Sequence, residues 1–255
     1  MRTEQFEESE PKTSEENWIY GDQKDISTRF WTPFDTAFLA TLRALEPYVT
    51  AKLNFLEVGF APGKILAWAA LKRGANVSGV DYSETGCLTA RRYFERAKVS
   101  ADIRCENVFD TSLNADTFDV VFSRGVIEHF DEPRLIVKKH VELTKKHGLI
   151  IILIPNYSGI WRRIQGKIDP KNLSIHNTDI MSPGALEALF DMDSCSIEKS
   201  GYLGPLSLSH LSMNRILPSF VANNLTRAVE LLSTLLPFPA HKFAPQVFVI
   251  ARKTM

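Results

Sequence analysis

Short apolar runs of strand length alternate with longer amphipathic stretches through the middle of the chain. The runs are bounded by turn residues, and the expected strands are 53–58, 76–80, 103–105, 118–122 and 148–154. Apolar residues recur at helical spacing around them, and the expected helices are 34–45, 64–73, 84–98 and 134–146. Strands and helices that alternate at this rhythm predict right-handed crossovers and a parallel sheet.

The C-terminal part of the chain adds two more apolar runs, at 195–198 and 246–250, which we expect to complete the sheet. Residues 206–242 between them form a segment longer than a strand connection needs. Its apolar residues fall close to helical spacing and prolines interrupt them, so a helical insertion before the last strand is expected. A chain of 255 residues can bury a core large enough for a seven-stranded α/β sheet with helices on both faces.

The turn after the first expected strand carries small residues at every second position, Gly59, Ala61 and Gly63. Small residues let the backbone come close to a ligand, and Asp81 at the end of the next strand can accept hydrogen bonds from ribose hydroxyls. This order of strand, turn, helix, strand and acid indicates a site for a nucleoside-bearing cofactor. A dinucleotide site would show Gly-x-Gly-x-x-Gly instead.

Three stretches, LEVGFAPGK, VSGVDYSETG and FDVVFSRGVIEHFDEP, resemble the class I S-adenosylmethionine-dependent methyltransferases. The resemblance is to the small-molecule group similar to the ubiquinone-biosynthesis O-methyltransferases, and it covers the core, 53–155, well and its flanks poorly. It implies a doubly wound, mostly parallel, seven-stranded Rossmann-like sheet whose last strand is antiparallel, with S-adenosyl-L-methionine as the cofactor.

The resemblance also implies which residues bind the cofactor. Glu57 orders the glycine turn, Asp81 binds the ribose, Asn107 and Val108 meet the adenine, and the Arg124 carbonyl lies near the cofactor amino group. The full expected set is Glu57, Gly59, Ala61, Pro62, Gly63, Asp81, Tyr82, Asn107, Val108 and Arg124. Two positions depart from the family, which commonly has glycine in place of Ala61 and aspartate in place of Asn107.

Methyl transfer is an in-line displacement, so much of its acceleration comes from positioning the acceptor behind the methyl group. For a hydroxyl acceptor, His129 is the leading candidate for a general base, because histidine titrates near neutrality. The alternative is that the Glu128–His129 pair shapes the floor of the site. His176 is a second candidate base, and since neither histidine has partners at metal-ligand spacing along the sequence, we predict no metal.

Acceptor specificity is expected from side chains outside the sheet, with 17–48 as an N-terminal lid and 206–242 as a helical cap. The cap is expected to cover a largely apolar or aromatic acceptor, with dimerisation as a second role and membrane contact least favoured, because it carries few cations. The candidate acceptor-binding residues are Trp18, Tyr20, Trp31, Tyr157, Trp161, Arg162 and His176.

Composition adds only coarse limits. Equal counts of acidic and basic residues argue against a nucleic-acid partner. Residues 1–16 are polar and acid-rich without a signal-type apolar core, so we expect a disordered tail before one domain, 17–255, in a cytoplasmic protein without stable membrane insertion. The three cysteines are scattered along the chain, which predicts reduced thiols. The oligomeric state, monomer or homodimer, stays open.

The sequence therefore predicts an S-adenosylmethionine-dependent methyltransferase that acts on a small molecule, most readily at oxygen. Two alternatives stay open. One is a non-catalytic cofactor-binding protein or partner subunit, suggested by Ala61 and Asn107. The other is the same fold used for a different reaction of an S-adenosyl cofactor.

Overall fold

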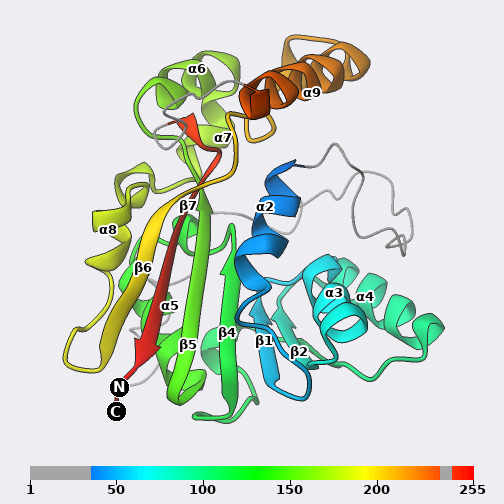
Figure 1. Ribbon diagram of the computed structural model, residues 1–255, viewed down its shortest axis with the longest axis vertical. Coiled ribbons are helices and arrows are strands. Elements are labelled where there is room, and N and C mark those ends of the chain that lie inside the picture. Colours follow the sequence, from blue (N-terminus) through cyan, green and yellow to red (C-terminus); the bar gives the residue numbers. More distant parts are fainter. Residues whose placement is uncertain (1–35, 236–242) are drawn as a thin grey trace.

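A seven-stranded mixed sheet organises the computed structural model, which describes residues 36–235 and 243–255 (Figure 1). Its strand order is β3-β2-β1-β4-β5-β7-β6. The strands are β1 (Asn54–Val58), β2 (Asn76–Asp81), β3 (Asp102–Cys105), β4 (Phe118–Arg124), β5 (Thr144–Pro155), β6 (Cys195–Leu203) and β7 (Gln246–Lys253). The predicted number of strands and the antiparallel last strand are both confirmed.

Strands β1 to β5 pair in parallel, and β7 pairs antiparallel with both β5 and β6. The order reverses at the middle, because the chain moves outward from β1 to β3 and then returns to place β4 on the other side of β1. Val58 at the end of β1 lies beside Val80 and Ser123. The carboxyl ends of β1, β2 and β4 therefore meet at one edge, beside the switch point where such sheets bind ligands.

Helices cover both faces of the sheet (Figure 1). They are α2 (Thr36–Leu45), α3 (Lys64–Arg73), α4 (Glu84–Ala97), α5 (Pro133–Leu143), α6 (Ile160–Ile168), α7 (Pro170–Ser174), α8 (Pro183–Glu187) and α9 (Ser219–Leu235), with short 3-10 turns η2 (Val108–Asp110), η3 (Ile127–His129), η4 (Thr178–Ile180) and η5 (Met213–Arg215). Helices α2, α3 and α4 bury their apolar sides in one core, and α5, α6 and α8 in the other.

Successive side chains along each central strand point alternately into the two cores. In β1, Phe55 joins the core under α3 and α4, whereas Leu56 joins the core under α5. In β5, Ile151 and Ile150 divide in the same way. Because each such side chain is almost fully buried, each contributes about 1.5–3 kcal/mol. A sheet buried on both faces explains why its central strands read as continuous apolar runs.

Several boundaries differ from the sequence prediction. The helix expected over 134–146 ends at Leu143, and β5 begins at Thr144 rather than Gly148. The Thr144 hydroxyl donates to the carbonyl of His140 in the last turn of α5, where the chain leaves the helix. Strand β6 extends to Leu203, beyond the predicted 195–198.

The expected disordered tail 1–16 and most of the expected lid, with Trp18, Tyr20 and Trp31, lie outside the described residues. Within the described part of the chain, no helix has the length and hydropathy that crossing a bilayer requires.

Candidate cofactor and acceptor site

The turn after β1 is built for close approach. Gly59 and Gly63 have φ angles of 68° and 97°, in the left-handed region that favours glycine. A Cβ atom at Gly59 would lie only 2.4 Å from Cγ2 of Val126, so no larger residue fits there without displacing the segment after β4. Ala61 does not have a positive φ, which is the condition under which alanine is tolerated at this position.

Asp81 sits beside this turn with its carboxylate held by two backbone donors. The amide of Ala61 donates to Oδ2 and the amide of Ser83 donates to Oδ1, each at 2.9 Å. A carboxylate can accept about four hydrogen bonds, so these donors orient the group and keep it an acceptor for further donors. The carboxylate is therefore at the turn, as the sequence predicted, rather than directed away from it.

Glu57 has a structural role at the same edge. Its Oε2 accepts a hydrogen bond of 3.1 Å from the amide of Leu66, in the first turn of α3. The residue before that helix, Gly63, has no side chain to cap it, so a carboxylate from β1 satisfies one of the free amides. Burial raises the pKa of Glu57 well above its usual value, and the hydrogen bond from Leu66 opposes that shift.

The two residues expected at the adenine follow β3. The Asn107 Oδ1 atom accepts from the amide of Phe109 at 3.0 Å and so caps η2. Asn107 is exposed and Val108 is buried beneath it. Tyr82, which follows Asp81, is 39% exposed, and the structure leaves its role beside the adenine a prediction.

A cavity of about 670 Å³ lies between the end of β4 and α9. Most of its lining is polar and includes Arg124, Ser209, Asn214, Asn223, Thr226 and Arg227. Several large apolar side chains of the segment expected to form the cap face outward, with Phe220 78% exposed. The side of the described part of α9 that borders the cavity is small and polar, and a largely apolar or aromatic acceptor beneath it stays a prediction.

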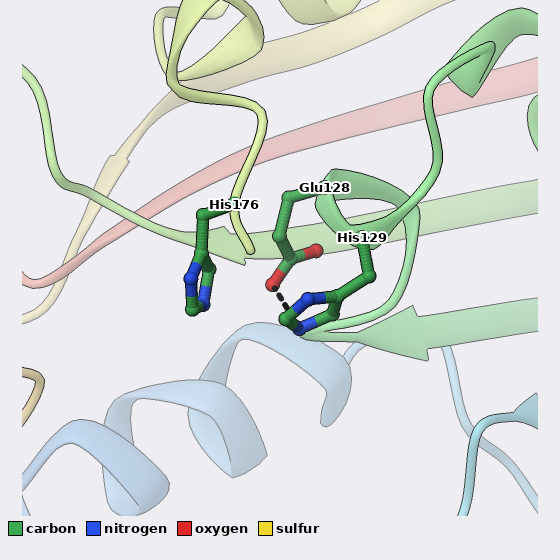
Figure 2. A group of neighbouring side chains, drawn as sticks. All are labelled: Glu128, His129 and His176. Atoms are coloured by element: carbon green, nitrogen blue, oxygen red, sulfur yellow. Dashed lines mark ion pairs between the residues drawn. The ribbon is translucent and has the colours of Figure 1, made fainter. Parts of the chain in front are cut away.

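The turn after β4 brings together residues that the sequence placed far apart. Glu128 and His129 lie in η3, and the chain returns after α7 to put His176 against them (Figure 2). The rings of His129 and His176 have centroids 4.5 Å apart. Nε2 of His129 lies 3.8 Å from Oε1 of Glu128. Spacing along the sequence, on which the prediction of no metal rested, does not reveal that one ligand atom of each of these three residues lies within 4.8 Å of the others.

Burial shifts the titration of this group. Glu128 is fully buried, which raises its pKa to about 8. Burial lowers the pKa of His176, although the hydrogen bond to the Asn172 carbonyl opposes the shift. His176 is therefore neutral at neutral pH, and its ring can act as a base or as a ligand.

Buried aromatic side chains pack next to this cluster. Tyr157 lies edge-on to His176, and its hydroxyl donates to the carbonyl of His210 at 2.6 Å. Trp161 packs edge-on to the ring of His210. Both predicted aromatics are thus brought together with His176, whereas Arg162 is exposed on α6.

His210 is a buried residue beside these aromatic side chains that the sequence analysis did not identify. Neither of its ring nitrogens has a hydrogen-bond partner within the described residues, and burial lowers its pKa to about 4. It lies between Ser209 and Leu211, and the sequence analysis of 206–242 considered only the apolar residues and prolines of that segment.

Comparison with known proteins supports the assignment of the core. Residues 56–152 match the family model described as a methyltransferase domain. This part of the chain is therefore similar to a methyltransferase domain. The match spans the turn after β1, the end of β2 and the Glu128–His129 pair, and it confirms the resemblance found in the sequence.

Relatives of this methyltransferase domain are found among ubiquinone biosynthesis O-methyltransferases. The protein from Coxiella burnetii (strain Dugway 5J108-111) is 30% identical over 108 residues, which cover 42% of this chain and 46% of the relative. The protein from Actinobacillus pleuropneumoniae serotype 7 (strain AP76) is 32% identical over 140 residues, which cover 49% and 58%. The chain thus spans about half the length of the curated relatives it matches.

Solved structures share the fold at lower identity. One is the geranyl diphosphate C-methyltransferase from Streptomyces coelicolor A3(2), in complex with Mg²⁺, geranyl diphosphate and S-adenosyl-L-homocysteine. It superposes with a TM-score of 0.58 at 15% identity and covers 85% of this chain and 79% of its own. At that identity the likeness establishes the Rossmann-like fold of the methyltransferase domain and nothing finer.

Proposed function

We propose that the protein is a class I methyltransferase that uses S-adenosyl-L-methionine and methylates a small-molecule acceptor, at oxygen in the first instance. The observation that carries this proposal is the Asp81 carboxylate, held by the amides of Ala61 and Ser83 beside a left-handed glycine turn. This arrangement suits a nucleoside whose ribose donates to the acid and whose amino-acid tail lies against the turn. The relatives are named as O-methyltransferases, which supports the reaction type.

The acceptor would approach from the side of β4 and the cap. Arg124 at the end of β4 borders the cavity, and Glu128 and His129 follow within the same turn. Because a sulfonium methyl group needs only a lone pair held in line behind it, holding the acceptor is the main task of this region. Tyr157 and Trp161 are each only 5% exposed and would support the acceptor side from within the core, whereas the polar lining of the cavity favours an acceptor that carries polar groups.

The structure indicates which nitrogen of His129 would act as the predicted general base. Nδ1 of His129 lies 3.0 Å from the carbonyl of Ile175, and a carbonyl can only accept, so Nδ1 carries the proton and Nε2 the lone pair of the neutral ring. As a base, His129 would therefore act through Nε2. Turnover that is unchanged in His129→Ala, with cofactor affinity retained, would reject that role.

Calorimetry on the full chain with S-adenosylmethionine and S-adenosylhomocysteine tests the cofactor site. We expect measurable affinity for both, and no affinity for either would overturn the proposal. Mass spectrometry of reactions with a panel of phenols, carboxylic acids, amines and thiols then tests transfer, where a mass gain of one methyl group identifies the acceptor class. Binding without transfer to any member of a broad panel would favour the non-catalytic alternative.

A further inference from the structure

Side chains that donate hydrogen bonds make up much of the lining of the cavity between β4 and α9. The described lining includes two arginines, Arg124 and Arg227, and the amides and hydroxyl of Asn214, Asn223 and Thr226. Arginine presents a fork of N–H donors and keeps its charge at any working pH. The cavity volume of about 670 Å³ is typical of a small-molecule site. The lining therefore suits a small ligand that accepts hydrogen bonds and carries negative charge.

The formal charges of this lining do not cancel. Glu230 is the one acidic residue in the described lining, against the two arginines, so the lining has a formal net charge of +1. The Glu230 side chain belongs to the wall itself, because it is only 3% exposed and its Oε1 accepts a hydrogen bond from the hydroxyl of Ser207. A carboxylate ligand would balance this net charge, whereas a phosphate monoester carries about −1.5 to −2 at neutral pH. The charge of the lining therefore matches one carboxylate better than one phosphate.

Arg124 connects the cavity with the cofactor edge of the sheet. It is the last residue of β4, which pairs with β1 at that edge. Burial raises the pKa of both Glu57 and Glu128, and the positive charge of Arg124 opposes the shift in each. The guanidinium group therefore lies within electrostatic reach of the cofactor turn and of the turn after β4. A negative group bound at Arg124 would place the rest of a small molecule close to the expected methyl donor.

Helix α9 turns one polar side to the cavity. The residues of α9 that line the cavity are spaced by one, three or four positions and so share one side of the helix; they are Ser219, Ala222, Asn223, Thr226, Arg227 and Glu230. The helix begins at Ser219, and its first-turn amides have no acceptors within the helix, so this end also favours negative charge. One side of a single helix thus supplies a continuous row of donors to the cavity.

A second wall of the cavity is held in place by buried side chains. Gln165 of α6 is fully buried, its Nε2 donates to the hydroxyl of Ser212 at 2.9 Å, and its Oε1 accepts from the amide of Ser212 at 3.0 Å. Arg215 donates to the carboxylate of Asp169 at 3.2 Å. These hydrogen bonds fix the chain on both sides of Asn214, which lines the cavity. A wall that is already ordered lowers the entropic cost of binding a ligand.

We propose that this cavity is a carboxylate subsite, and that the acceptor is a small carboxylic acid whose methylated atom is a different one. Arg124 and Arg227 bind the carboxylate, since the planar fork of an arginine matches two carboxylate oxygens at once. Asn223 and Thr226 add neutral donors. The carboxylate is an anchor and takes no part in the bond changes of methyl transfer. The role of this acid as acceptor rests on the proposed function, whereas its binding in the cavity does not.

Calorimetry on the full chain, with and without S-adenosylhomocysteine, tests the subsite. The probes are glycolate, lactate, mandelate and phenyllactate, each beside its primary amide, together with phenyl phosphate. The amide has the shape of the acid without its charge, so we expect the best acid to bind about tenfold or more tightly than its amide. Arg227→Gln should weaken binding of that acid by about 10–150-fold, and Arg227→Lys should weaken it less, because lysine keeps the charge but not the fork.

A matched control and the cofactor titration make the outcomes distinct. Arg163 is an exposed arginine of α6 outside the described lining of the cavity, so Arg163→Gln should leave the affinity for the acid unchanged. Binding of an acid by a chain that has no affinity for the cofactor would keep the subsite and overturn the proposed function. Cofactor binding with no preference for any acid over its amide would overturn the subsite alone. Equal affinity for the acid in wild type and Arg227→Gln, tighter binding of phenyl phosphate, or a methyl ester as the product would each overturn it as well.

Discussion

Ala61 and Gly86 form a pair across the cofactor turn, and their coupling can be measured. A Cβ atom placed on Gly86 in the first turn of α4 would lie 2.3 Å from the Cβ of Ala61, closer than real Cβ contacts occur. Gly86→Ala must therefore push the turn away from α4. Because the Ala61 amide donates to Asp81, the displacement should reach the residue that we expect to hold the ribose.

The expected change in the free energy of unfolding follows from two opposing effects. Overpacking a buried contact costs about 1–3 kcal/mol, whereas alanine is favoured over glycine in a helix by about 0.5–1 kcal/mol. Gly86→Ala should therefore destabilise the wild-type chain by about 1–2 kcal/mol. In a chain that carries Ala61→Gly the opposing methyl group is gone, so the same change should be neutral or stabilising by up to about 1 kcal/mol.

A double-mutant cycle measures this coupling. Denaturant unfolding of the wild type, both single variants and the double variant gives four free energies, and we expect an interaction of about 1–3 kcal/mol. Calorimetry with S-adenosylmethionine should show a loss of affinity in Gly86→Ala that Ala61→Gly restores. An effect of Gly86→Ala that is the same in both backgrounds within about 0.5 kcal/mol would refute the steric argument.

Three further predictions concern buried polar groups. Asp81→Asn should weaken S-adenosylmethionine binding by about 10–150-fold, because a hydrogen bond to a charged group is worth about 1.5–3 kcal/mol; a change below about threefold in calorimetry would contradict this. Glu57→Ala should lower the free energy of unfolding by about 1–3 kcal/mol, since the Leu66 amide loses its acceptor; denaturant titration measures the loss, and an unchanged midpoint would count against the capping role. Burial lowers the pKa of His140 to about 4. The folded pKa is below the unfolded value of about 6.5, so the contribution of neutral His140 to the free energy of unfolding is full above pH 6.5 and should fall by about 2 kcal/mol on going to pH 5. His140→Leu should flatten this pH dependence. Equal slopes of the free energy of unfolding against pH in both proteins would exclude His140 as the cause.

Much of the sheet could be predicted because its signals are local. Strand β1, helix α3 and strand β2 follow one another with short turns, and their boundaries are marked by Gly63, Gly74 and Asp81. The cofactor residues share this property, since the turn and the acid are set by positions along two consecutive strands. Sequence spacing alone therefore placed Asp81 beside Ala61.

The boundary between α5 and β5 was harder to predict from the sequence, because Lys145 and Lys146 fit the polar side of a helix as well as the start of a strand. The chain leaves the helix at Thr144, whose strand pairing with Phe118 decides the matter. Helices α6, α7 and α8 are short and were not predicted. Helices α7 and α8 have five residues each, too few for helical periodicity to show, and α6 is amphipathic but only nine residues long.

The acceptor side depends on contacts between distant segments. His129 and Ile175 are 46 positions apart, and their hydrogen bond is what brings His176 to the cluster. No spacing rule links these segments. The side of α9 that faces the cavity was likewise decided by packing, since Ala222 is buried there whereas Phe220 is exposed, although hydrophobicity alone favours the opposite.

The two departures from the family pattern no longer argue strongly for a non-catalytic protein. Ala61 keeps its φ out of the positive region, its methyl group fits against Gly86, and its amide reaches Asp81. Asn107 caps η2 through its side-chain oxygen, a role that an aspartate would fill in the same way, so the change removes charge but not geometry. Neither departure fills the space beside the turn. If the protein binds the cofactor without transferring its methyl group, the cause should therefore lie on the acceptor side, where Glu128 and its two histidine neighbours meet.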